Sequence, residues 1–582
     1  MLTENHKKRI AIIGAGPSGL YIFDKFIKSG NMDFELDIFE KKKQFGSGMP
    51  YSAEGANEEH VTNVSDNEIP HLETTINEWI KTVPKAILTK FKINLDSFNE
   101  YKVLPRLLFG QYLSSQFELL KTKAKRVPIS VRQHIDVVED IQYQPNEVTI
   151  KTISGNIYNF DFIVICTGHH WPTKEEGKIP GYFDSPYPPA KLRLLQNNAI
   201  AIRGTSLTAI DAIRTLARHN GSFSTDKNGK LKFNVSNNSP DFKIVMHSRN
   251  GMLPAVRFHL EDSHLSSESL LSKEEIAENI LQNDGFLSLD FLFEKDFKEK
   301  FIRADPKFYT RIKDQSIEDF VDSMMELREK LDPFQLLKEE YAEAEKSIKR
   351  KESIHWKEML AVLSFGMNQP AKHLSAEDML RLQKILMPLI AIVIAFVPQS
   401  SCRELIALYE AGILNIVPVG SESAVVPVIT GGINYNYRDE DNDLHSVYYK
   451  TFVDCIGQPH LSFEEFPFKS LMESNTISPA YLRFKSAEKG YELLAKGNKS
   501  VLKSNNGNYY LKVPGIAIND NFQVVDEYGS ANNRIYIMSV PYIGGYNPDY
   551  SGLDFCNSAS DIITKSMLSE TSWNEYQSSS LK

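Results

Sequence analysis

The stretch from Lys8 to Glu40 constrains the fold more than any other part of this chain. It reads KRIAIIGAGPSGLYIFDKFIKSGNMDFELDIFE. The short apolar run from Arg9 to Ile13 is typical of a strand that is covered on both faces. Gly14, Gly16 and Gly19 follow at the spacing G-x-G-x-x-G, and the patterns of a helix and a second strand come next. This order predicts a Rossmann-type unit.

Each glycine of this motif meets a different need of a dinucleotide site. Gly14 permits the tight turn out of the strand, and Gly16 lets the backbone approach a pyrophosphate. Gly19 lets the following helix lie close to the sheet. The pattern therefore predicts a dinucleotide site, and the alternative is an ordinary glycine turn.

The residues around the glycines favour the same interpretation. Pro17 and Ser18 begin the helix, whose free N–H groups and partial positive charge attract phosphate. Glu40 ends the second strand about 20 residues after the glycines, where an acidic side chain accepts hydrogen bonds from ribose hydroxyls.

A second unit of the same type begins at Ala199, with the sequence AIAIRGTSLTAIDAIRTLARHNG. Its apolar strand meets Gly204, and its helix is expected to end at Gly221. The next strand, residues 242–246, runs into His247-Ser248-Arg249. Two such units in one chain predict two nucleotide-binding domains.

The character of the sequence changes between about residues 260 and 395, where glycine becomes scarce and charged helical patterns dominate. We interpret this region as a helical insertion. Its most apolar run, Ile385 to Val397, is too short to cross a bilayer and contains Pro388, so a buried core segment is the better interpretation.

Composition excludes several classes of protein. A chain of 582 residues is too long for one core, and its net charge of −9 argues against nucleic-acid binding. The four cysteines are far apart, which argues against a disulfide scaffold, a zinc ribbon and a redox dithiol. We expect no metal site and no membrane span. The N-terminal apolar run stops at Gly14, which does not suit a signal peptide, so a cytoplasmic protein is expected.

The motifs occur in a characteristic order: the first glycine motif, GSGMPYS, VLPRLLFGQYL, ICTGHHWP, RGTSLTAIDA, HSRNGMLP, DCIGQP and IYIMS. In this order the chain resembles the bacterial FAD-NAD(P)-binding proteins of the YdhS type. More distantly it is similar to flavoproteins with two dinucleotide domains, including flavin N-hydroxylases and Baeyer–Villiger monooxygenases. The similarity covers roughly residues 1–260 and 395–570, and the helical insertion also resembles the YdhS type.

The resemblance implies an α/β fold with two Rossmann-like dinucleotide-binding domains, for FAD and NADP, and a large helical insertion. The FAD domain would comprise residues 1–195 and 458–582. The NADP domain would comprise residues 196–259 and 396–457, and the insertion residues 260–395.

The resemblance also implies which residues contact FAD. The first glycine turn and Glu40 would contact its pyrophosphate and ribose. Thr167 and Gly168 match an element found where the chain crosses to the second domain, and Asn63 and Arg106 match further family elements. The terminal Gly-Asp of such flavoproteins is missing from IYIMSVPYIGG.

For the second cofactor the resemblance assigns Gly204, Thr205 and Ser206 to the glycine turn. This turn departs from the pattern because Ser206 and Ala209 replace glycines. Arg249 follows the second strand of its unit, where a guanidinium would pair with the 2′-phosphate of NADP, so NADPH is expected over NADH.

Two dinucleotides in one chain imply hydride transfer from the nicotinamide to the flavin, and three functions remain open. The first is a monooxygenase acting through a flavin hydroperoxide on nitrogen of an amino-acid-like or other small metabolite. The second is an oxidoreductase that passes electrons to a quinone, a small acceptor or a partner protein. The third is a low-turnover FAD/NADP-binding sensor or scaffold. The sequence assigns neither a catalytic residue nor an oligomeric state.

Overall fold

The two glycine turns follow the carboxyl ends of interior strands in two mainly parallel β-sheets. The computed structural model describes residues 7–260 and 270–569. The first sheet has the order β23-β24-β9-β1-β2-β5. All of its neighbouring strands are parallel except β23, which runs antiparallel to β24. The strands are β1 (Lys8–Ile13), β2 (Phe34–Glu40), β5 (Ser130–Ile135), β9 (Phe162–Ile165), β23 (Gln523–Val525) and β24 (Ala531–Ile537).

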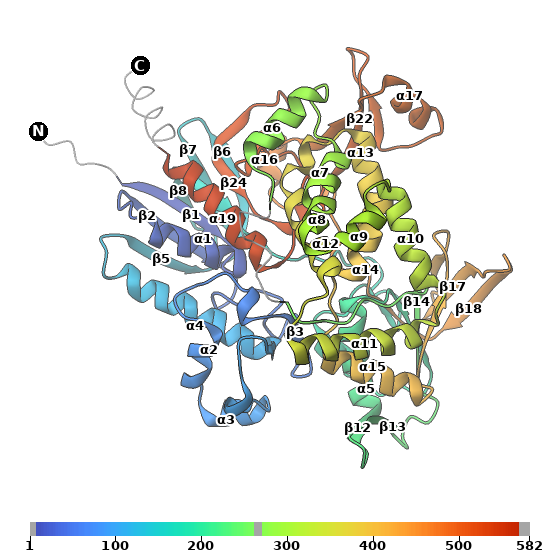
Figure 1. Ribbon diagram of the computed structural model, residues 1–582. Coiled ribbons are helices and arrows are strands. Elements are labelled where there is room, and N and C mark those ends of the chain that lie inside the picture. The colour runs from blue at the N-terminus through green and yellow to red at the C-terminus, as the bar shows by residue number, and fades with distance from the viewer. Residues whose placement is uncertain (1–6, 261–269, 570–582) are drawn as a thin grey trace, which may run out of the picture.

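The first sheet is covered by helices that come from opposite ends of the chain. Figure 1 shows α19 (Gly552–Leu568), in red, beside α1 (Pro17–Lys28), in blue. The long helix α4 (Arg106–Ala124) also packs against α1. Ile10, Ala11 and Ile12 of β1 are fully buried, as expected for a strand that is covered on both faces.

The second sheet has the order β10-β19-β11-β14-β15, and all its neighbouring strands are parallel. Its strands are β10 (Tyr182–Phe183), β11 (Ala199–Arg203), β14 (Lys243–Ser248), β15 (Leu414–Pro418) and β19 (Thr451–Asp454). Helix α5 (Leu207–Asn220) follows β11 and ends at Gly221, as the sequence predicts. β14 and β15 are neighbours although the insertion separates them in sequence.

The insertion is a body of helices, drawn green to yellow in Figure 1. Its helices, with the one that follows it, are α6 (Lys273–Gln282), α7 (Leu289–Asp296), α8 (Phe301–Ala304), α9 (Pro306–Ile312), α10 (Ile317–Glu329), α11 (Pro333–Arg350), α12 (His355–Asn368), α13 (Ala376–Arg381), α14 (Met387–Val393) and α15 (Gln399–Glu410). A small antiparallel sheet completes its hydrophobic core: β20 (Pro479–Arg483), β21 (Val501–Lys503) and β22 (Tyr509–Ile516).

The remaining strands and helices are short and lie outside the two main sheets. The strands pair as β3 (Val61–Ser65) with β4 (Val103–Pro105), β6 (Val138–Gln144) with β7 (Glu147–Thr152) and β8 (Ile157–Phe160), β12 (Gly221–Thr225) with β13 (Leu231–Val235), and β16 (Ala424–Pro427) with β17 (Ile433–Arg438) and β18 (Leu444–Tyr449). The short helices are α2 (Ile76–Trp79), α3 (Lys85–Lys90), α16 (Lys469–Glu473), α17 (Ala487–Ala495) and α18 (Val540–Ile543).

The architecture confirms the predicted fold class, an α/β chain with two Rossmann-type units and a helical insertion. Within the described residues, none of the helices has the length and apolar character needed to span a bilayer. The domain division remains a proposal, which we amend in two places. Residues 182–183 join the second sheet, and residues 479–513 contribute to the core of the insertion.

Candidate functional sites

The first glycine turn is as tight as its sequence predicts. Gly14 has a φ of +99°, and a Cβ atom added to it would lie 2.6 Å from the carbonyl oxygen of Cys166. Its N–H donates to the carbonyl of Phe39 at 2.8 Å. A Cβ on Gly19 would lie 2.1 Å from the Gly14 carbonyl oxygen, so only glycine lets α1 begin this close to the turn.

The N-terminus of α1 is left open to an anion. Pro17 occupies the start of the helix, and no acidic residue stands in the first turn. Gly16 precedes Pro17 and has no side chain that could cap the helix. The free N–H groups and the helix dipole therefore favour a phosphate here.

Glu40 is held against this turn from the end of β2. Its Oε2 accepts a hydrogen bond from the N–H of Ala15 at 2.9 Å, and its Oε1 accepts one from the N–H of Lys42 at 3.2 Å. The carboxylate thus lies at the glycine turn, where a ribose attached to a bound pyrophosphate would meet it.

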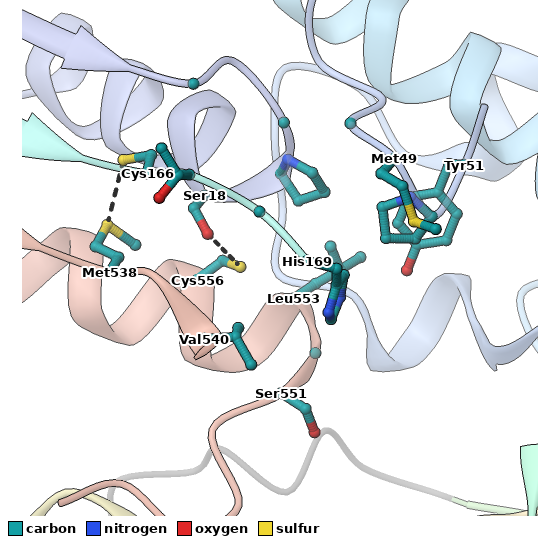
Figure 2. Close-up of a pocket in the computed structure, with 18 of the residues that line it drawn as sticks. Ser18, Met49, Tyr51, Cys166, His169, Met538, Val540, Ser551, Leu553 and Cys556 are labelled. Carbon is teal, nitrogen blue, oxygen red and sulfur yellow. Dashed lines mark hydrogen bonds between the residues drawn. The ribbon is translucent and has the colours of Figure 1, made fainter. Parts of the chain in front are cut away.

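Two cavities at this turn form one groove, because they share Gly14, Glu40, Lys41, Thr167, Gly168 and His169. One cavity extends over α1 toward the start of α19, and it is shown in Figure 2. The other extends past the end of β5, where Val137 and Val138 line it together with Phe466 and Phe468. The groove therefore has an apolar pocket at each side of the phosphate-binding turn.

The groove fits FAD by two observations. Two glycines face each other across the turn: a Cβ atom on Gly16 would lie 3.2 Å from the Cα of Gly48, so no side chain stands between the backbone here and a bound pyrophosphate. Tyr550 lines the groove, and its hydroxyl is buried and has no hydrogen-bond partner within the described residues. A buried unpaired hydroxyl is costly, and a polar group of a bound cofactor would satisfy it.

The predicted FAD residues divide into two groups. Gly14, Gly16, Pro17, Ser18, Glu40, Thr167 and Gly168 all line the groove. Gly19 supports the turn from beneath. Asn63 and Arg106 lie elsewhere among the described residues: the Asn63 carbonyl accepts a hydrogen bond from Arg257, and the Arg106 guanidinium pairs with Asp211.

Sequence reasoning missed several residues of the groove. Met49 and Tyr51, which belong to the GSGMPYS loop, line it (Figure 2). The local sequence of this loop predicts a turn at its glycines but no cofactor contact, and Gly48 adopts a positive φ of +61°. Tyr550 and Ser551 come from the other end of the chain and carry no local signal.

The second glycine turn repeats the geometry of the first. Gly204 has a φ of +109°, and a Cβ on it would lie 2.7 Å from the carbonyl oxygen of Cys455. Its N–H donates to the carbonyl of His247 at 2.7 Å. Ser206 precedes α5, as Gly16 precedes α1, and makes no side-chain capping bond within the described part of the chain. This helix N-terminus is likewise open to an anion.

A cavity of about 660 Å³ lies at this second turn. It brings together the predicted residues Gly204, Thr205, Ser206 and Arg249. Ser248 stands where Glu40 stands in the first unit, and its Oγ accepts a hydrogen bond from the N–H of Gly251 at 3.0 Å. Arg249 is exposed and forms no ion pair with any residue that the structure describes. The second site thus has a serine in the place of the acid, and a guanidinium without an ion-pair partner among the described residues follows directly.

His247 supports this cavity from beneath. Its ring stacks on Tyr435 with a centroid distance of 4.1 Å, and the Tyr449 hydroxyl lies 3.3 Å from its Nε2. Burial lowers the pKa of His247 to about 4. The imidazole is therefore neutral at physiological pH, and it lines the cavity as an uncharged aromatic ring.

The two sites meet where the chain crosses between the domains. Gln458 ties the crossovers together, because its Oε1 accepts from the His170 N–H at 2.8 Å and its Nε2 donates to the His170 carbonyl at 2.7 Å. The Trp171 indole N–H donates to the Gly457 carbonyl at 2.9 Å. His169 lines the first groove, and burial lowers its pKa.

A buried polar cluster joins the domains beside these crossovers. The Arg106 guanidinium pairs with the Asp211 carboxylate at 2.6 Å, and the Tyr187 hydroxyl donates to the same carboxylate at 2.9 Å. Burial alone would raise the pKa of Asp211, but Arg106, His60 and Tyr187 outweigh it and lower that pKa. The cluster therefore stays charged and fixes α4 against α5.

Two mainly parallel sheets, each with a glycine turn that opens a helix beside a cavity, define a protein with two dinucleotide-binding domains. The family model described as FAD-NAD(P)-binding matches residues 11–170, and the model described as YdhS-like middle domain matches residues 272–394. The protein YdhS of Escherichia coli is 30% identical over 478 residues, which are 80% of this chain and 86% of YdhS. The chain therefore belongs to the YdhS family, and it binds FAD and a nicotinamide dinucleotide.

Two monooxygenases share shorter stretches with the chain. The thiol-specific monooxygenase of Saccharomyces cerevisiae is 25% identical over 189 residues, which are 32% of this chain and 40% of that enzyme. The trimethylamine monooxygenase of a Pelagibacter strain is 28% identical over 165 residues, 28% of this chain and 36% of that enzyme. These stretches relate the chain to the flavin monooxygenases.

Proposed function

We propose that this protein is an FAD-dependent, NADPH-using monooxygenase that oxygenates nitrogen of an amino-acid-like or other small metabolite. The observation that carries this proposal is the pairing of two dinucleotide turns, at Gly14 and Gly204, across crossovers that Gln458 ties together. A flavin in the first site would accept a hydride from a nicotinamide in the second and pass the electrons to oxygen.

The chain's own residues bind and orient the two cofactors in this proposal. The N-terminus of α1 and Glu40 hold the pyrophosphate and ribose of FAD, with Thr167 and Gly168 beside them. The N-terminus of α5 holds the second pyrophosphate. Arg249 pairs with the 2′-phosphate, because it lines the cavity one residue after Ser248, which stands where NAD-binding units place an acid.

The cysteines favour an acceptor from outside the protein. All four lie within the described residues, and all are free and buried. Burial raises the pKa of Cys166, Cys402, Cys455 and Cys556, so their thiols stay protonated and unreactive. The relative named a trimethylamine monooxygenase acts, by that name, on an amine, and this supports nitrogen as the site of oxygenation.

Rapid mixing tests the proposal. The enzyme is reduced by NADPH without oxygen and then mixed with oxygenated buffer. We expect a transient absorption that differs from those of oxidised and reduced flavin. A panel of primary amines, tertiary amines and thiols should then show one class that replaces hydrogen peroxide release by oxygenated product.

Each other function has its own signature in the same experiment. Direct reoxidation without a transient, together with rapid electron transfer to a quinone or dye, would establish a plain oxidoreductase. Turnover slower than one per minute with every acceptor would indicate a sensor or scaffold. Oxygenation of thiols alone would retain the monooxygenase and overturn nitrogen as its target.

A further inference from the structure

The apolar run that stood out in the sequence, Ile385 to Val397, lies between two environments. Most of it forms α14. Leu389, Ile390 and Val393 are fully buried in the core of the insertion. Pro388, Ala391 and Ile392 face away from that core and line the cavity at the second glycine turn. The run is therefore apolar on two faces for two different reasons.

An irregular helical turn precedes α14 and sets the direction in which Pro388, Ala391 and Ile392 point. Residues Leu382–Leu386 form a π-helical turn, in which the Met387 N–H donates to the Leu382 carbonyl five residues back. Pro388 follows directly and has no N–H of its own to continue the regular ladder. Such wide turns are rare and occur frequently at functional sites.

The end of α14 is fastened to the segment that follows Arg249. The Ala255 N–H donates to the Ile392 carbonyl at 2.9 Å, and the Val397 N–H donates to the Ala255 carbonyl at 2.9 Å. Met252 and Pro254, on the same segment, line the same cavity. The insertion and the Rossmann unit thus form one continuous wall around the site.

We propose that the helical insertion is part of the nicotinamide dinucleotide site, with the Pro388, Ala391 and Ile392 face of α14 in contact with the cofactor. The inference rests on the proposed function, because it takes that dinucleotide as the occupant of the cavity. The phosphates are provided for by the N-terminus of α5 and by Arg249. The face on α14 carries no charge, so it receives a ring system of the cofactor by apolar contact.

Filling the cavity from α14 tests this assignment. Ala391 is exposed, so Ala391→Trp places a large ring in the cavity without disturbing the core of the insertion. The matched control is Ala342→Trp, at an exposed alanine on α11, another helix of the insertion. Binding of NADP⁺ is measured by titration calorimetry, and FAD content by visible absorbance.

We expect Ala391→Trp to weaken NADP⁺ binding at least tenfold while FAD content stays at the wild-type level. Ala342→Trp should bind NADP⁺ as the wild type does. The fluorescence of the new indole at position 391, but not at 342, should be quenched by NADPH, whose absorption overlaps indole emission. A milder variant, Ile392→Ala, removes part of the apolar contact and should also weaken NADP⁺ binding, but by less. If Ala391→Trp does not fold, the NADP⁺ affinity of Ile392→Ala tests the same assignment.

Equal NADP⁺ affinity in the wild type, Ala391→Trp and Ile392→Ala would overturn the assignment of α14 and leave the proposed function standing. A wild-type protein that contains FAD but binds neither NADP⁺ nor NAD⁺ would overturn the proposed function itself. The two failures are therefore distinguishable.

Discussion

Arg106 and Asp211 form a buried ion pair of 2.6 Å although they belong to different dinucleotide domains. Arg106 begins α4 beside the first sheet, and Asp211 lies on α5 of the second unit. Charges of the two domains meet directly in this pair, and the Tyr187 hydroxyl donates a hydrogen bond to the same carboxylate. Because the pair is buried between the two domains, any movement that separates them would expose or unpair these charges and cost free energy.

The first prediction concerns this pair. Asp211→Asn leaves the Arg106 guanidinium buried without a counter-charge and should cost about 3 kcal/mol or more. The double variant Arg106→Met/Asp211→Asn removes both charges and should recover part of that loss. Urea unfolding followed by circular dichroism measures both effects.

An exposed pair supplies the control for this prediction. Lys90 and Glu58 lie 2.9 Å apart at the surface, and Lys90→Ala should change stability by less than about 1 kcal/mol. If the two single variants Arg106→Met and Asp211→Asn add up to the double variant, the residues are not coupled and the cluster does not hold the domains.

The second prediction uses the symmetry of the two turns. A Cβ on Gly16 would lie 3.2 Å from the Cα of Gly48, so the branched Gly16→Val side chain should push that loop away and block the approach of a pyrophosphate. We expect at least tenfold weaker FAD binding, about 1.4 kcal/mol, measured from flavin absorbance after dialysis.

Ser206→Val is the matched control, because Ser206 holds the place of Gly16 at the second turn. It should leave FAD content unchanged and affect only the nicotinamide cofactor. Full FAD occupancy in Gly16→Val would remove Gly16 from the flavin site.

The third prediction concerns the choice between NADPH and NADH. If Arg249 holds the 2′-phosphate, Arg249→Ala loses a charged hydrogen bond worth about 1.5–3 kcal/mol. NADPH binding should weaken roughly tenfold or more, while NADH binding should stay nearly unchanged. Steady-state KM values for both cofactors, with Lys243→Ala at the opposite end of β14 as the control, measure the effect. Equal losses for both cofactors would show that Arg249 attracts them without reading the phosphate.

The parts of the site that could be predicted are those whose geometry is set by residues close together in the sequence. The glycine turns, Pro17 and Glu40 lie within one strand-turn-helix-strand unit, and their spacing alone fixes their geometry. The same holds for Gly204 and the strand end that carries Arg249. The fold class followed from the repetition of this unit.

The parts that could not be predicted depend on contacts between distant segments. Arg106 matches a family element, but its partner lies 105 residues away and nothing in either local sequence announces it. Tyr550 reaches the groove from the far end of the chain. The apolar run around Pro388 is buried in the core of the insertion on one face, as its sequence predicts, but only the structure shows that its other face lines the cavity at Gly204.

The last prediction is a pH dependence that arises at His247. Burial lowers the pKa of this residue to about 4 in the folded protein, whereas the unfolded chain takes up the proton at about 6.5. Between these values the unfolded state binds more protons, so the contribution of His247 to stability is complete above pH 6.5 and is lost as the pH falls toward 4. Each pKa unit is worth about 1.4 kcal/mol, which gives a total on the order of 3 kcal/mol.

His247→Phe should remove this pH dependence, because phenylalanine takes up no proton, and its ring can keep the stack on Tyr435. Phenylalanine suits this position, since Phe39 stands at the corresponding place in the first unit. The decrease in melting temperature from pH 7.5 to pH 5 should therefore be smaller in His247→Phe than in the wild type. Comparing the two proteins cancels the contributions of the other histidines. His219→Gln, at an exposed position on α5, should behave as the wild type does. An identical decrease in His247→Phe and the wild type would show that His247 is not a source of acid sensitivity.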